Sequence, residues 1–113
     1  MELNRFVQSV ANSKLEVDKF CKIKTYLPIQ DKINFIQEYY RTLGDMFKDN
    51  KYDKAEGLIA FVIFNLMVIR TYTDVELDLS FESMDLLQKN DLINKIVAKI
   101  GEDYEALLGF IRF

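Results

Sequence analysis

The sequence contains no histidine and no tryptophan, and it has a single cysteine, Cys21, and a single proline, Pro28. Without histidine, the chain lacks the commonest general base of enzymes and cannot form a Ser-His or Cys-His nucleophile pair. One cysteine excludes an intramolecular disulfide, and a lone thiol without histidine is typical of a small buried side chain. No zinc ligand set and no glycine-rich phosphate loop is present. We therefore expect no enzymatic activity, no cofactor and no metal.

Turn-forming residues are also scarce. One proline and four glycines in 113 residues favour helices over a many-stranded sheet. Half of the residues are apolar and 29% are charged, which is the balance of an ordinary globular protein. We expect a single helical domain over residues 1–113. The predicted fold class is all-α, a bundle of five or six helices around a buried central helix. Whether one short two-stranded extended pair accompanies it stays open.

The net charge of −3 argues against nucleic acid as a partner. An aromatic ring near basic residues, here Tyr26 near Lys22 and Lys24, is a feature of proteins that bind single-stranded nucleic acid. Acidic residues interrupt the basic ones in this chain, which argues against such binding. Residues 1–54 carry a surplus of two positive charges, and residues 55–113 a surplus of five negative charges. Chance distribution over a solvated surface explains this, and head-to-tail packing between copies is the alternative.

The longest apolar stretch predicts the central helix. From Leu58 to Ile69 every residue except Asn65 is apolar, and a helix that is apolar on all sides is buried or in a membrane. The stretch is shorter than the roughly 20 residues that cross a bilayer, so we expect no membrane partner. The residues expected in the core are Leu58, Phe61, Val62, Phe64, Asn65, Met67 and Ile69.

Local signals mark the ends of this helix. Asp53 is expected to cap its N-terminus, with Glu56 completing a capping box, and Arg70 suits the negative end of the helix dipole. For Asn65 two interpretations are open. Its amide makes a local hydrogen bond at a partly wet position, or it is buried and sets helix register or oligomer pairing.

A second long helix is predicted after Pro28. This proline restricts Leu27 to an extended conformation and is itself favoured in the first turn of a helix. Apolar residues then recur at steps of three or four, and the helix is expected to end near Gly44. The stripe expected to face the core is Ile29, Ile33, Ile36, Tyr40, Leu43 and Phe47.

Residues 73–80 alternate strictly between apolar and polar side chains, which predicts an extended segment. It either pairs with residues around 15–24 or lies over the bundle with its apolar side chains inserted. Its acidic side chains, with Glu82 and Asp85, supply oxygen atoms that suit calcium, but the EF-hand pattern is absent and a solvated face is favoured. The two sides of the segment are Val75, Leu77 and Leu79, and Asp74, Glu76 and Asp78.

Short amphipathic helices are predicted at both ends of the chain. The first covers residues 3–10, one starts after Ser80 as its cap, another covers 92–100 and ends at Gly101, and a last helix follows it. Phe110 and Phe113 near the C-terminus either fold into the core or dock on a neighbour. Docking is the favoured interpretation. Phe110, Phe113, Asp74, Glu76 and Asp78 are therefore candidate interface residues.

Three short motifs occur along the chain: Tyr-Leu-Pro at 26–28 followed by Lys32, Tyr-Thr-Asp at 72–74, and the pairs Leu86-Leu87 and Leu92-Ile93. Together they resemble a family of small, mostly helical proteins from tailed phages of low-GC Gram-positive hosts and their relatives. Order and spacing agree over residues 15–108. The resemblance implies a phage-encoded helical protein and supplies no site residues.

Two function classes follow. The first is a non-enzymatic structural or assembly protein that contacts other virion proteins or copies of itself in a head, connector or tail. Residues 1–5 lack the pattern of a signal peptide, so such a protein is expected in the host cytoplasm during assembly. Its structural role would then place it in the virion. The second is a small acidic inhibitor of a host or defence enzyme, whose carboxylates mimic a nucleic-acid backbone.

Overall fold

Six α-helices form the regular structure of the chain in the computed structural model, which describes residues 1–111. A short 3₁₀ helix, η1 (Val17–Lys19), follows the first of them, and an extended piece follows η1. No strand is assigned within the described residues, and the all-α prediction is confirmed. The helices are α1 (Leu3–Ala11), α2 (Ile29–Phe47), α3 (Glu56–Tyr72), α4 (Phe81–Lys89), α5 (Leu92–Ile100) and α6 (Glu102–Gly109).

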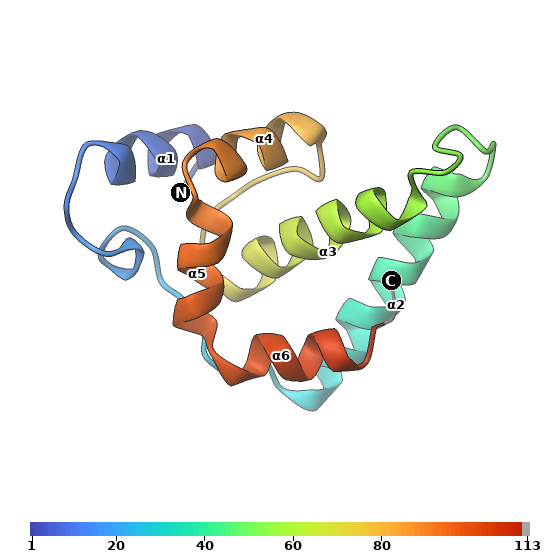
Figure 1. Ribbon diagram of the computed structural model, residues 1–113. Helices are drawn as coiled ribbons and strands as arrows, with labels where there is room; N and C mark the ends of the chain where they lie inside the picture. Colours follow the sequence, from blue (N-terminus) through green and yellow to red (C-terminus); the bar gives the residue numbers. More distant parts are fainter. Residues whose placement is uncertain (112–113) are drawn as a thin grey trace.

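The helix α3 lies in the middle of the molecule (Figure 1). It forms a hairpin with α2, while α1 and α4 lie above it in this view, and α5 leads down to α6. The molecule extends 42 × 30 × 19 Å. Its shortest dimension is about the thickness of two packed helix layers.

The burial of α3 changes along its length. Residues 62–69 are all buried, and they include Val62, Phe64, Asn65, Met67 and Ile69, which were expected in the core. The same prediction was wrong for two residues in the first turns of α3. Leu58 has 65% of its surface exposed and Phe61 has 38% exposed. These turns lie towards the α2–α3 loop, away from α5 and α6 (Figure 1).

The helix α3 also begins later than predicted. Asp53 does not cap it, because the N-cap position falls on Ala55, which makes no side-chain cap. Asn50 and Lys54 adopt left-handed backbone conformations, and two tight turns close the loop before the helix starts. The other end agrees with the prediction, since Arg70 lies in the last turn and its guanidinium contacts Glu38 of α2 at 2.9 Å.

The buried face of α2 is rotated from the predicted stripe. Ile29, Ile33 and Tyr40 of that stripe are exposed, and the prediction was wrong for them. Leu43 is buried, and Ile36 and Phe47 are partly buried against the core. The helix continues through Gly44 to Phe47. The buried residues of α2 are Lys32, Phe35, Tyr39 and Leu43.

A buried ion pair accounts for this rotation of α2. The Lys32 ammonium donates hydrogen bonds to Asp103 Oδ1 at 2.9 Å and to the Leu27 carbonyl at 2.6 Å. Asp103 Oδ2 accepts from the Tyr72 hydroxyl at 2.6 Å and from the Leu27 N–H at 2.9 Å. We call these four residues the Asp103 hub. It joins the entry to α2, the end of α3 and the first turn of α6, so Lys32 has to point inwards.

The hub determines the ionisation of its members. Burial raises the pKa of Asp103, but hydrogen bonds from Tyr72, Lys32 and Leu27 outweigh burial and bring the pKa below its ordinary value of 3.8. Burial, together with the bond to Asp103, raises the pKa of the Tyr72 phenol. Asp103 is therefore a carboxylate and Tyr72 a neutral donor at neutral pH.

Residues 73–80 lie over the helices rather than forming a strand. The Lys24 N–H donates to the Tyr72 carbonyl at 2.7 Å beside a single antiparallel bridge from Ile23 to Thr73, and a single parallel bridge joins Glu2 to Glu76. One bridge on each side is too little for a sheet. The alternation holds, because Val75, Leu77 and Leu79 are buried or half-buried while Asp74, Glu76 and Asp78 are exposed.

Asn65 combines features of both interpretations. Its amide donates to the Phe61 carbonyl one turn earlier at 2.9 Å, and its side-chain oxygen accepts from the Tyr104 hydroxyl at 3.0 Å. The side chain is buried, so it fixes the register of α3 against α6 within one chain. These bonds satisfy both polar ends of the amide.

Candidate functional site

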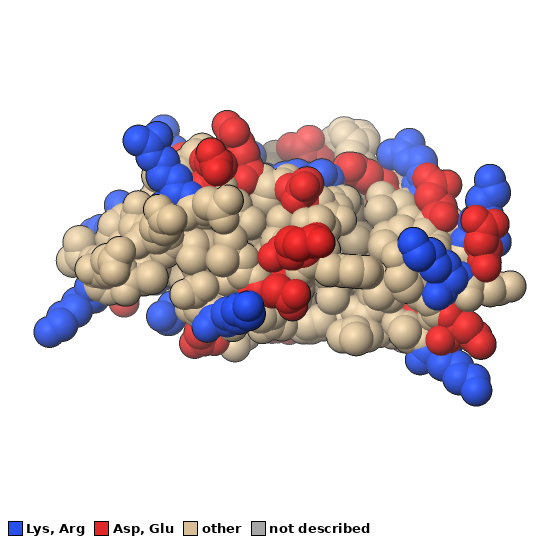
Figure 2. Space-filling view, turned by 90° about the horizontal axis from the view of Figure 1, so that it is seen from above, with Lys and Arg blue, Asp and Glu red and all other residues tan. Residues whose placement is uncertain are grey.

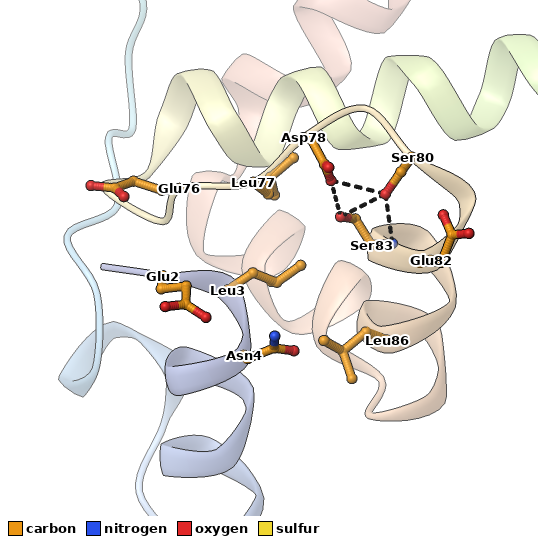
Figure 3. Close-up of a pocket in the computed structure, with 10 residues that line it drawn as sticks. All are labelled: Glu2, Leu3, Asn4, Glu76, Leu77, Asp78, Ser80, Glu82, Ser83 and Leu86. Atoms are coloured by element: carbon orange, nitrogen blue, oxygen red, sulfur yellow. Dashed lines mark hydrogen bonds between the residues drawn. The ribbon is translucent and has the colours of Figure 1, made fainter.

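A groove of about 620 Å³ lies between the start of α1, residues 76–80 and α4 (Figure 3). Carboxylates stand at its two ends, Glu2 and Glu76 at one and Glu82 at the other, with leucines between them (Figure 3). We call it the acidic groove. Its lining residues are Glu2, Leu3, Asn4, Glu76, Leu77, Asp78, Ser80, Glu82, Ser83 and Leu86.

Backbone hydrogen bonds hold the first two walls of the acidic groove together. The Leu3 N–H donates to the Glu76 carbonyl at 3.1 Å, and the Glu76 N–H donates to the Met1 carbonyl at 2.6 Å. The Met1 ammonium donates to the Asp74 carbonyl at 2.9 Å. Residues 1–3 are thereby tied to a segment more than 70 positions away in the chain. This pairing places Glu2 next to Glu76.

The third wall begins with a capped helix. Ser80 is the N-cap of α4, as predicted, and its hydroxyl oxygen accepts from the Ser83 N–H at 3.1 Å. The hydroxyls of Ser80 and Ser83 donate to Asp78 Oδ1 at 2.9 and 2.7 Å. The bonds from Ser83 and then Ser80 hold the pKa of Asp78 below its ordinary value. Asp78 is ionised at neutral pH and connects the extended segment to α4.

Negative charge dominates the acidic groove. Its four carboxylates, on Glu2, Glu76, Asp78 and Glu82, are exposed, and the described residues that line it include no lysine or arginine. The Met1 ammonium lies 3.8 Å from Glu76 Oε1 and offsets part of this charge at one end. Figure 2 shows a band of acidic side chains across the middle of the face that carries α1 and α4. The groove can attract a cationic partner.

A second hollow, of about 310 Å³, lies between α3 and α4. The exposed residues Leu58, Phe61 and Phe81 line it. We call it the apolar groove. Its lining residues are Leu58, Ile59, Phe61, Val62, Phe81, Met84, Asp85 and Gln88.

The candidate interface residues do not form one site. Glu76 and Asp78 line the acidic groove, but Asp74 does not, since its Oδ1 accepts from the Lys22 N–H at 2.9 Å. Phe110 follows α6 and has 67% of its surface exposed. Phe113 lies outside the described residues.

The sequence grouped Glu82 with the acidic side chains of residues 73–80, and all of these except Asp74 line the acidic groove. It did not indicate the wall that Glu2 and Leu3 form at the start of the chain. The sequence carried no signal that residues 1–3 would lie alongside Glu76.

Cys21 is buried, and its thiol donates to the Val17 carbonyl at 3.7 Å. Burial, with smaller contributions from Asp74 and Asp18, raises its pKa from 9.0 to about 11. The raised pKa lowers the thiolate fraction at neutral pH about 100-fold, and the thiolate is the form that reacts.

We expect an aromatic disulfide reagent to modify Cys21 of the folded protein at least about 100-fold more slowly than Cys21 of the urea-unfolded chain. Equal rates would contradict the burial of Cys21.

In the part of the chain that the structure describes, no three cysteine or carboxylate side chains stand close enough together to hold a metal ion. Over the same residues, each helix is too short or too polar to span a membrane.

No protein-family model, curated protein or solved structure matches the chain.

Proposed function

We propose that the chain is a non-enzymatic structural or assembly protein of a tailed phage. It acts in a head, connector or tail through contacts with other virion proteins or with copies of itself. The phage assignment rests on the three motifs at residues 26–32, 72–74 and 86–93. We place the protein in the host cytoplasm during assembly and in the virion afterwards.

The exposed apolar face of α3 is the observation that carries the contact role. A helix that is apolar on all sides is normally covered on all sides. Here the cover is complete at residues 62–69 and incomplete at Leu58 and Phe61, where the apolar groove opens. Contiguous apolar surface of this kind is characteristic of protein interfaces. The groove thus supplies a place where a partner completes the packing of α3.

Mass spectrometry of purified phage particles tests the role directly. The protein is expected among the virion proteins at a defined copy number. Sedimentation velocity of the purified protein tests self-association independently. A protein that stays monomeric and does not purify with particles contradicts the proposal.

Substituting Leu58 with serine tests the apolar groove. We expect about tenfold weaker association with the partner, because burying a leucine side chain contributes about 1.5–3 kcal/mol. The measurement is the copy number in particles, or the dissociation constant if the protein self-associates. Leu15→Ser is the matched control, since Leu15 lies outside the groove and is 61% exposed, close to the 65% of Leu58. Equal effects of the two substitutions would remove the groove from the interface.

The acidic groove favours a second candidate function, that of an inhibitor which binds a host or defence enzyme. Its four carboxylates form a negative face without lysine or arginine among the described residues that line it, and such a face suits an enzyme cleft that normally binds nucleic acid. Pull-down from host lysate separates the two functions. An inhibitor retains one host enzyme reproducibly, and a virion protein does not.

A further inference from the structure

We propose that the acidic groove binds a basic, amphipathic segment of a partner protein, with apolar side chains on the leucines and lysine or arginine on the carboxylates. The proposal concerns a different surface from the apolar groove. It does not depend on whether the protein is a virion component.

The apolar part of the acidic groove selects the kind of partner. Leu3 is buried, while Leu77 and Leu86 are only partly buried and contribute apolar surface to the groove. Attraction between charges alone does not require solvent-accessible leucines in a binding surface. Covering them gives a docked segment hydrophobic free energy that a simple cation does not gain.

The order of charges along the acidic groove sets the pattern of the segment. Glu2 and Glu76 stand at one end, Glu82 at the other, and leucines lie between them (Figure 3). A matching segment carries basic residues on both sides of an apolar centre. Asp78 adds charge along the wall, and the two serine hydroxyls fix its position. The Met1 ammonium, 3.8 Å from Glu76 Oε1, competes with the partner's cations at that end.

The walls of the acidic groove are held in place before a partner arrives. Backbone hydrogen bonds link residues 1–3 to Glu76, and Asp78 and Ser80 link the extended segment to α4. A groove that is already formed requires little ordering upon binding. Its exposed carboxylates also speed the encounter with a cationic partner at low ionic strength.

The test uses a labelled synthetic amphipathic peptide of leucine and lysine and the full-length protein, with affinity measured by fluorescence anisotropy. Two control peptides keep the same pattern, one with glutamate in place of lysine and one with serine in place of leucine. We expect the leucine–lysine peptide to bind more tightly than either control. Amide chemical-shift changes should centre on Leu3, Leu77 and Leu86. Binding of the serine–lysine peptide with equal affinity would overturn the proposal.

Matched charge variants locate the binding. The double substitution Glu76→Gln/Glu82→Gln is expected to weaken peptide binding about fivefold, since each exposed ion pair contributes modestly. The control Glu102→Gln/Glu105→Gln removes the same charge from exposed positions on α6, outside the groove. The control should bind as the unmodified protein does. An equal loss in both double variants would show attraction to net charge alone and overturn the proposal. All four positions are exposed, so the fold should tolerate these changes.

Discussion

Replacing Asp103 by asparagine is expected to lower the free energy of unfolding by about 3–5 kcal/mol, because it leaves a buried lysine ammonium without its counter-charge. The side chains of Lys32 and Asp103 are each only 8% exposed, so water cannot compensate the charge. Asparagine retains one oxygen that can accept from Leu27 and Tyr72, but its NH2 group cannot accept from the Lys32 ammonium, so the loss combines the counter-charge and that hydrogen bond. Urea unfolding followed by circular dichroism measures it.

The double variant Lys32→Met/Asp103→Asn is the control for this result. It removes both charges, and we expect it to be more stable than Asp103→Asn alone, because no unpaired buried charge remains. A double variant less stable than the single one would contradict the assigned role of the ion pair.

The hub also predicts the response to acid. The folded-state pKa of Asp103 lies below the unfolded value of 3.8. Its stabilisation is therefore complete above the unfolded pKa and is lost as the pH falls through the folded pKa. The unmodified protein should lose this contribution below pH 3.8, and Asp103→Asn should lack that part of the acid dependence.

Replacing Phe64 by alanine is expected to lower the free energy of unfolding by about 3–5 kcal/mol, because the core cannot fill the cavity that remains. The Phe64 ring is fully buried, and its centroid lies 5.7 Å from that of Phe35, 6.0 Å from that of Tyr39 and 5.6 Å from that of Tyr104. It joins α2, α3 and α6. Calorimetric or urea unfolding provides the measurement.

Phe61→Ala is the matched control for Phe64→Ala. It changes the same residue type in the same helix, three positions earlier, where 38% of the side chain is exposed. We expect a cost near 1 kcal/mol, in the range of ordinary substitutions. Similar costs for the two variants would mean that the burial pattern of α3 is incorrect.

Most helix positions could be predicted from the sequence. Pro28 immediately precedes α2, Ser80 caps α4, and Gly101 ends α5 with a φ of +77° that favours glycine. The spacing of Leu3, Phe6, Val7 and Val10 predicted α1, and all four are buried. Each of these signals acts within about one helical turn, so neighbouring residues contain the information.

The candidate site could be predicted only in part. Alternation at 73–80 identified Glu76 and Asp78 as exposed carboxylates, which they are. Glu82, close to Asp78 in the sequence, was grouped with them, whereas Glu2 joined them only because backbone pairing brings residues 1–3 alongside Glu76. No local pattern encodes such pairing.

The sequence by itself determined that the chain is helical and approximately where its helices lie. The tertiary structure decided which sides of those helices are buried. On α2 it turned Tyr39 inwards and Tyr40 outwards, because Lys32 finds its carboxylate 71 positions further along the chain. On α3 it enclosed residues 62–69 but left Leu58 and Phe61 exposed, because at the first turns of α3 a groove separates this helix from α4. A helix is set by hydrogen bonds between near neighbours, whereas its buried face depends on distant partners.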